Sequence, residues 1–215
     1  EFGKESVYAT QGNTNNHVGV PQNILNLRKG HKFAIIEMGS NHPGEIETLS
    51  RIAEPDTGII VSIGKAHIEF LGGYEGVARE KSAIFAKMSA DGTAVIPAEG
   101  PGIGIMEKAA AKFKVMRFGG EKTKNADVSI VYKGGNLSGS SFEISAGFCG
   151  LRRTISWGLA GRHQAMTAGA AFLAAISAGV PPEKAAAALG KVSQLPGMRM
   201  RIQERDGVIW INDAY

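Results

Sequence analysis

Cysteine is nearly absent from this sequence, since 215 residues contain only Cys149. That scarcity excludes an internal disulfide and any metal site built from several cysteines, and it is more typical of intracellular than of secreted proteins. The first ten residues carry charge from the start and hold no apolar run, so we expect no secretory signal. The only long uncharged stretch with a largely nonpolar make-up, residues 164–182, is dominated by alanine, glycine and small polar residues and is too weakly apolar to insert in a bilayer. We therefore expect a cytoplasmic protein without membrane insertion.

Charge of either sign is also in short supply. There are 24 Lys and Arg against 20 Asp and Glu, a net charge of +4. So dilute an excess does not indicate a nucleic-acid partner, although it suits a phosphate-bearing ligand as well as an ordinary soluble surface. The length and the 43% share of hydrophobic residues allow one large domain or two small ones with a sizeable core.

Between residues 7 and about 118, short apolar runs alternate with helical patterns, which is typical of βα units. The continuous apolar runs 33–38 and 57–63 predict parallel strands covered by helices on both faces. We expect helices after Pro43 and over 75–88 and 103–113, with strands at 93–98 and 114–118. The predicted fold class is α/β, with a mainly parallel sheet flanked by helices.

The pattern changes after Gly119. Three strand-like segments, 128–134, 141–146 and 151–157, are separated by turns too short for helices, which predicts a small antiparallel subsheet. Helices return at 163–178 and 182–189, and an apolar strand ends the chain, from which we expect a further domain beyond it. Trp157 and Trp210 are interpreted as packing residues beside strands.

Residues 10–21, TQGNTNNHVGVP, form the densest polar motif and lie between the first strand and an apolar helix. Amides, hydroxyls and glycines at the carboxyl end of a strand make a neutral cradle for phosphates or a peptide-like substrate. A polar turn with an asparagine helix cap would explain the same composition, and the sequence leaves both interpretations open.

Glu37 ends an apolar strand, and His67 follows the next strand along the chain. Adjacent parallel strands would bring the two side chains together at one sheet edge, where they could bind magnesium or manganese. A buried acid paired with a lysine, and an ordinary loop histidine, are the alternatives. On composition alone, Lys81 and Glu80 are interpreted as solvated helix charges. Arg199 near a phosphate and Asp213 near a ribose make chemical sense, but their spacing does not demonstrate it.

Several segments carry one resemblance, and they are ATQGNTNNHVGVP, FAIIEMGSNHPGEIETLSRIAEP, the AH of GKAHIEFLGG, VAREKSAIF and INDAY. In this order and spacing they resemble the Mur ligases over essentially the whole chain. The resemblance implies a central, P-loop NTPase-like ATP-binding domain at 1–205 and the first strand of a C-terminal domain at 206–215. It implies a monomeric ligase of peptidoglycan precursor synthesis that uses ATP and Mg²⁺ to join D-alanyl-D-alanine to a UDP-N-acetylmuramoyl-tripeptide through an acyl phosphate.

The resemblance also implies roles for individual residues. Glu37, His67 and Lys81 would hold magnesium, with Lys81 carbamylated by carbon dioxide and so carboxylate-like. The implied catalytic residues are Lys81, His67 and Arg199, the ATP contacts are Asn13, Gln164, Arg199 and Asp213, and the substrate contacts are Thr10, Asn15 and Asn16. Arg201 is the alternative register for Arg199.

Two departures from the family pattern bear on function. The phosphate loop G-x-x-G-K-T/S belongs ahead of the first strand, but here Gly3 and Lys4 are followed by Glu5. Gln164 stands where the family commonly has an asparagine that contacts adenine. We therefore expect the 215-residue chain alone not to ligate. The alternatives are another ligase of the superfamily, such as a folylpolyglutamate synthetase, and a non-catalytic nucleotide-binding module.

Overall fold

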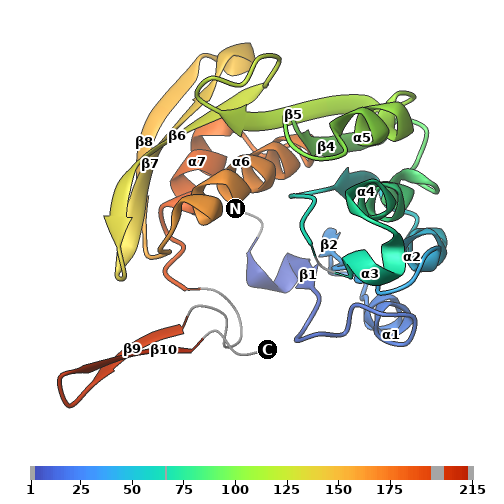
Figure 1. Ribbon diagram of the computed structural model, residues 1–215, viewed down its shortest axis with the longest axis horizontal. Coiled ribbons are helices and arrows are strands. Elements are labelled where there is room, and N and C mark those ends of the chain that lie inside the picture. Colours follow the sequence, from blue (N-terminus) through green and yellow to red (C-terminus); the bar gives the residue numbers. More distant parts are fainter. Residues whose placement is uncertain (1–2, 66, 195–200, 213–215) are drawn as a thin grey trace. The chain divides into compact units, whose positions relative to one another are not determined.

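The computed structural model describes residues 3–65, 67–194 and 201–212 (Figure 1). The chain divides into two compact units, Glu1–Met116 and Arg117–Tyr215. Strands β3 to β8 make one six-stranded sheet in that order, whereas β1 pairs with β2 and β9 with β10. The α/β prediction is confirmed, although the first two strands form a pair of their own.

The first unit alternates strands and helices. Its elements are η1 (Lys4–Ser6), β1 (Val7–Ala9), α1 (Gly19–Leu25), β2 (Phe33–Ile35), α2 (Glu45–Ala53), β3 (Thr57–Ile59), α3 (Ile68–Leu71), α4 (Tyr74–Ser82), η2 (Ala83–Phe85), β4 (Thr93–Pro97), α5 (Ile103–Ala110) and the first part of β5 (Lys114–Gly120). The pairs β1–β2 and β3–β4 are both parallel, as the continuous apolar runs predicted. The predicted covering of both faces is wrong for β2, because Ala34 and Ile35 are exposed.

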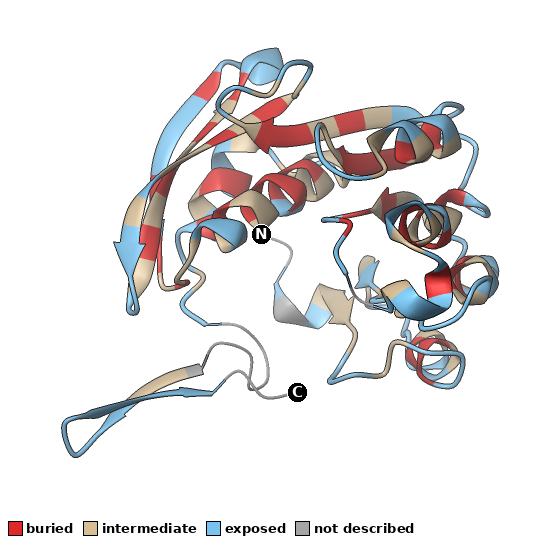
Figure 2. Cartoon of the chain, in the orientation of Figure 1, coloured by how far each residue is buried: buried red, intermediate tan, exposed pale blue. Residues whose placement is uncertain are grey.

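Two apolar clusters hold this unit together. The larger one includes Val77 and Phe85 of the α4–η2 segment, Ile96 of β4 and Met106 of α5, all at most 2% exposed. The smaller one joins α1 to α2 through Val20, Ile46 and Leu49. Figure 2 shows how buried positions cover β4 and one side of α4. The smaller cluster matters for function because α1 and α2 follow the two polar loops predicted to form the site.

The helix predicted over 75–88 is shorter in the structure. The α-helix ends at Ser82 and continues as the 3-10 turn η2. The four-residue helix α3 was not predicted, since a single turn is too short to show helical periodicity.

The second unit carries the antiparallel strands. Its elements are β6 (Val128–Asn136), β7 (Gly139–Ala146), η3 (Gly147–Cys149), β8 (Leu151–Trp157), α6 (Arg162–Ser177), α7 (Pro182–Leu189), β9 (Arg201–Arg205) and β10 (Val208–Asn212). Strand β6 pairs in parallel with β5 and antiparallel with β7, which pairs with β8. The predicted meander is therefore an extension of the parallel sheet. None of the described helices is long and apolar enough to cross a membrane.

Strands β9 and β10 form an antiparallel hairpin, with Val208 opposite Arg205. The domain boundary predicted between residues 205 and 206 coincides with the turn of this hairpin and stays a prediction. Trp210 is 59% exposed, so its interpretation as a packing residue is wrong within the described part of the chain. An alternating or apolar strand pattern does not say whether another element covers the strand.

The two tryptophans should report these different surroundings. Trp157 is 8% exposed, and its Nε1 donates to Ser140 Oγ at 2.9 Å. We expect the Trp210→Phe variant to fluoresce at short wavelength with little quenching by iodide. The Trp157→Phe variant should instead emit like tryptophan in water and be strongly quenched. Equal quenching of the two variants would contradict the exposed hairpin.

Candidate functional site

The polar loop after β1 is hydrogen-bonded to the loop after β2. The Glu37 backbone N–H donates to Thr10 Oγ1 at 2.9 Å, and Asn15 Nδ2 donates to Glu37 Oε1 at 2.9 Å. The Gly39 N–H also donates to the Asn15 carbonyl oxygen at 2.8 Å. Because β1 and β2 are parallel, their carboxyl ends lie side by side, and three predicted site residues meet there.

The two remaining asparagines of the motif are placed differently. Asn16 Oδ1 accepts hydrogen bonds from the N–H groups of Val18 and Gly19, at 3.1 and 2.9 Å. It therefore caps the start of α1, the structural alternative that its sequence context left open. Asn13 is exposed, and its carbonyl oxygen accepts from the Asn15 N–H at 2.9 Å.

Asn23 of α1 holds this loop in place through hydrogen bonds, and it was not among the predicted site residues. It is 3% exposed on α1, its Nδ2 donates to the Thr14 carbonyl oxygen at 2.7 Å, and its Oδ1 accepts from the Tyr8 hydroxyl at 2.7 Å. A buried amide with both ends bonded fixes the groups around it. The sequence feature that could have indicated this role is the position of Asn23 on the apolar face of a predicted helix.

Glu37 lies exposed beyond the end of β2. An ionised carboxylate can accept about four hydrogen bonds, so the bond from Asn15 orients Glu37 and leaves acceptor capacity for a cation.

His67 is exposed and lies directly before α3. Its backbone is left-handed, with φ 56° and ψ 24°, a conformation that costs a non-glycine residue energy and is enriched at functional sites. The prediction that neighbouring strands bring Glu37 and His67 together is not what the described strands show, because β2 pairs with β1 and β3 with β4. A ring contact links the loop after β2 to helix α3, since the His42 and Phe70 ring centroids are 5.4 Å apart.

Glu80, interpreted from the sequence as a solvated charge, is only 6% exposed. Its Oε2 accepts from the Gly44 N–H at 2.7 Å and its Oε1 from the Ile46 N–H at 2.8 Å. These donors begin helix α2 and would otherwise lack partners. The correction was visible in the spacing, because position 80 follows the buried Val77 by three residues. Lys81, the next residue, is half-buried on α4.

Glu45 orders the loop before α2. Hydrogen bonds from the backbone N–H groups of Asn41 and His42 to Oε2, at 2.7 and 3.0 Å, lower the pKa of the Glu45 carboxyl below its ordinary value. Desolvation opposes this shift, whereas positive charge on His42 or His17 adds to it. Because the folded-state pKa is lowered, the stabilisation is present above the unfolded-state pKa and is lost as the pH falls through the folded-state pKa.

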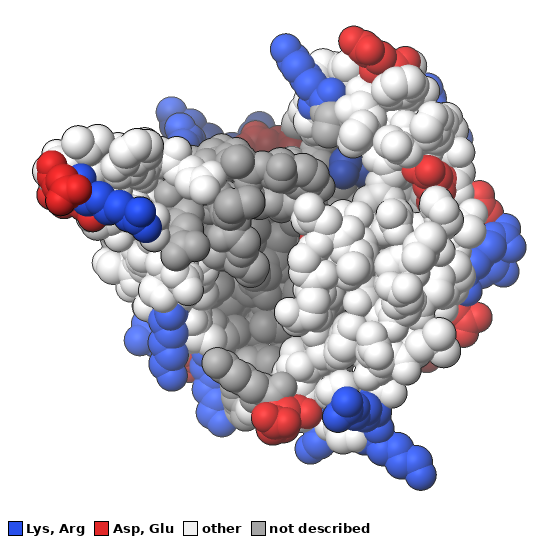
Figure 3. Space-filling view, turned by 90° about the horizontal axis from the view of Figure 1, so that it is seen from below, with Lys and Arg blue, Asp and Glu red and all other residues white. Residues whose placement is uncertain are grey.

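The donor chemistry at this end of the first unit fits a divalent cation, although the described residues contain no cluster of three His, Cys, Asp or Glu arranged for a metal. The Glu37 carboxylate and the His67 imidazole are exposed and supply oxygen and nitrogen ligands of the kinds that bind a divalent cation. A carbamate on Lys81 would add a third, anionic oxygen ligand. On the face drawn in Figure 3, basic and acidic side chains are interspersed, so the net charge is not gathered there.

Of the predicted ATP contacts, Asn13 lies in the first unit and Gln164 in the second. Gln164 is half-buried in the first turn of α6, and its N–H donates to the Gly161 carbonyl oxygen at 3.2 Å. Arg199 and Asp213 lie outside the described residues. Arg201, the alternative register, begins β9.

A family model described as the Mur ligase middle domain matches residues 2–175. The chain belongs to this family. It is 34% identical to the UDP-N-acetylmuramoyl-tripeptide D-alanyl-D-alanine ligase of Bacillus subtilis over 97% of this chain and 44% of that protein. The corresponding ligase of Haemophilus influenzae is 30% identical over 98% of this chain and 45% of that protein.

Solved structures of Mur ligases agree. A crystal structure of MurF from Acinetobacter baumannii superposes with a TM-score of 0.90 at 30% identity, over 99% of this chain and 45% of that one. The MurF ligase of Thermotoga maritima in complex with ADP gives 0.81 at 27% identity, over 99% and 48%. The chain thus spans less than half the length of these relatives.

The folylpolyglutamate alternative is less well supported. A folylpolyglutamate synthase from Thermotoga maritima gives a TM-score of 0.63 at 21% identity over 87% of this chain, a likeness of fold alone. The predicted resemblance to the Mur ligases is confirmed.

Proposed function

We propose that this chain is the central domain of an ATP-dependent ligase that adds D-alanyl-D-alanine to a UDP-N-acetylmuramoyl-tripeptide. The observation that carries the proposal is the joining of Thr10, Asn15 and Glu37 at the carboxyl ends of β1 and β2. It supports the proposal because these residues belong to two separate motifs that the relatives' similarity covers from end to end. The ligase would act as a monomer in the cytoplasm, where nucleotide-linked precursors are made.

The reaction proceeds in two steps. A carboxylate oxygen of the tripeptide bonds to the γ-phosphorus of ATP as the bond to ADP breaks, giving an acyl phosphate. The amine of D-alanyl-D-alanine then bonds to the acyl carbon and loses a proton, while phosphate leaves with that oxygen. Positioning and charge neutralisation supply most of the catalysis in such phosphoryl transfers.

The chain's own residues would prepare this site. Bound Mg²⁺ would neutralise phosphate charge. Glu37 and His67 would hold the ion, with Asn15 fixing the orientation of the Glu37 carboxylate. Thr10 would fix the Glu37 backbone through its 2.9 Å hydrogen bond.

Lys81 would contribute after reacting with carbon dioxide. The neutral amine bonds to the carbon atom of carbon dioxide and releases one proton, which leaves a carbamate with one negative charge shared by two oxygens. Nucleotide contacts would come from Asn13, Gln164, Arg199 and Asp213, with Arg199 at the phosphates and Asp213 at the ribose.

We expect the polypeptide that carries this chain to release phosphate from ATP only when both the UDP-linked tripeptide and D-alanyl-D-alanine are present. The 215-residue chain alone, which has no G-x-x-G-K-T/S motif, should show no such phosphate release. Release of phosphate that depends on glutamate and a folate would favour the alternative ligase. Failure of the whole polypeptide to turn over any such pair would favour the non-catalytic module.

A further inference from the structure

We propose that Glu80 is a positioning residue, which fixes Lys81 relative to the loop that carries Glu37. The inference rests on the proposed function because it concerns the same site. Glu80 is not one of the metal, nucleotide or substrate contacts proposed above. Its carboxylate works through the backbone of another helix.

The Glu80 carboxylate is a charged group in a buried position. Glu80 is 6% exposed, and a buried carboxylate is stable only when hydrogen bonds replace its water. The Gly44 and Ile46 N–H groups supply them at 2.7 and 2.8 Å, at the positive end of the nine-residue helix α2. The protein's own carboxylate therefore occupies the position that an anionic ligand would need at α2.

Two sets of hydrogen bonds align the segment from α4 to η2 with helix α2. Glu80 and Gly44 are 36 residues apart in sequence, so their bond joins α4 to the start of α2. Further along, Ser50 Oγ donates to the Ile84 carbonyl oxygen at 2.9 Å and accepts from the Lys87 N–H at 3.3 Å. Lys81 lies between these two attachments, so the backbone that carries it is held to α2 on both sides.

The same alignment extends to the loop that carries Glu37. The loop from Glu37 to Gly44 is held at its start by Asn15, through the Glu37 carboxylate and the Gly39 N–H. Glu80 holds its other end at Gly44. Glu37 and the helix that carries Lys81 are thus connected by a loop whose two ends are both held by hydrogen bonds. Residues that do not bind the metal themselves commonly orient metal ligands through such bonds.

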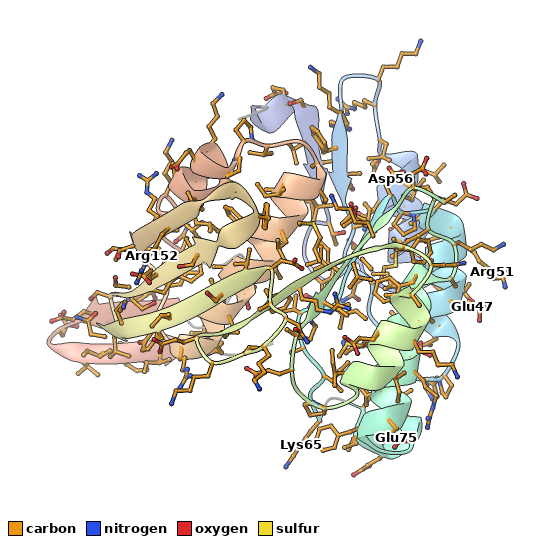
Figure 4. The ribbon with its side chains drawn as sticks, turned by 90° about the horizontal axis from the view of Figure 1, so that it is seen from above. Glu47, Arg51, Asp56, Lys65, Glu75 and Arg152 are labelled. Atoms are coloured by element: carbon orange, nitrogen blue, oxygen red, sulfur yellow. The ribbon has the colours of Figure 1, made fainter. Side chains whose placement is uncertain are left out.

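The test compares Glu80→Gln with Glu75→Gln in the polypeptide that carries this chain. Glu75 is a matched control because it lies in the first turn of the same helix, with a side chain 76% exposed beside Arg79 (Figure 4). In Glu80→Gln we expect faster amide exchange at Gly44 and Ile46 and a shifted ¹³Cε resonance of Lys81. We also expect kcat to fall about 10- to 100-fold and the Mg²⁺ concentration for half-maximal activity to rise.

Glu80→Asp keeps the charge but has a shorter side chain, so it should fold and show the same changes at smaller size, even if Glu80→Gln unfolds. Faster exchange at Gly44 and Ile46 with an unchanged Lys81 resonance and unchanged Mg²⁺ dependence would assign Glu80 a purely structural role and overturn the inference. If the wild-type protein does not ligate while the Lys81 resonance still shifts in Glu80→Gln, the proposed function fails and the positioning stands.

Discussion

Replacing Lys81 with alanine is expected to lower kcat of the complete ligase by about 100-fold or more, equivalent to about 2.7 kcal/mol of lost transition-state stabilisation. The substitution deletes the group that would carry the carbamate, while alanine keeps α4 helical and leaves the Glu80 hydrogen bonds in place. Melting temperature and the KM for D-alanyl-D-alanine should change little. Phosphate release at saturating substrates is the measurement.

The control for this experiment is Lys87→Ala. Lys87 is exposed a few residues further along, and only its backbone N–H makes a described contact, to Ser50 Oγ. Formate or acetate should restore part of the activity of Lys81→Ala but not affect wild type, because a small carboxylate can occupy the place of the carbamate. Unchanged activity in Lys81→Ala would disprove the carbamate proposal. A loss without rescue would assign the role to the lysine ammonium instead.

Local pattern was enough to predict the scaffold of the site. Continuous apolar runs predicted β2 and β3, and the polar residues after β1 and β2 predicted where the candidate residues would gather. Thr10, Asn15 and Glu37 do meet, because parallel pairing of β1 and β2 follows from the βα pattern. These features depend on neighbours in sequence or on one strand pairing.

Other features depend on partners that local pattern does not specify. Glu80 is buried because two N–H groups more than thirty residues away need an acceptor. Asn16 serves as a helix cap although its motif equally suits a ligand. The contact between the Glu37 loop and helix α3, which follows His67, is a ring contact between His42 and Phe70 and not a strand pairing. Such contacts are set by tertiary packing, which overrides local propensity.

Replacing Gly19 with alanine should destabilise the first unit by about 3 kcal/mol or more, the upper range for forcing an atom into a packed site. An added Cβ would lie 2.4 Å from the Thr14 carbonyl carbon and 2.5 Å from its oxygen. These are backbone atoms, which cannot move aside like the end of a flexible side chain. The polar loop would have to separate from α1, and Asn16 would lose its hydrogen bond to the Gly19 N–H.

Gly30→Ala is the matched control because an added Cβ there meets no atom within 4 Å. Urea unfolding of both variants should show a lower midpoint for Gly19→Ala and nearly the wild-type midpoint for Gly30→Ala. Since Asn15 and Thr10 belong to the displaced loop, Gly19→Ala should also weaken their hold on Glu37. Equal midpoints would mean that the loop does not pack against α1 as closely as the structure shows. An unchanged requirement for Mg²⁺ in the folded fraction would separate the loop's structural role from its proposed role in orienting Glu37.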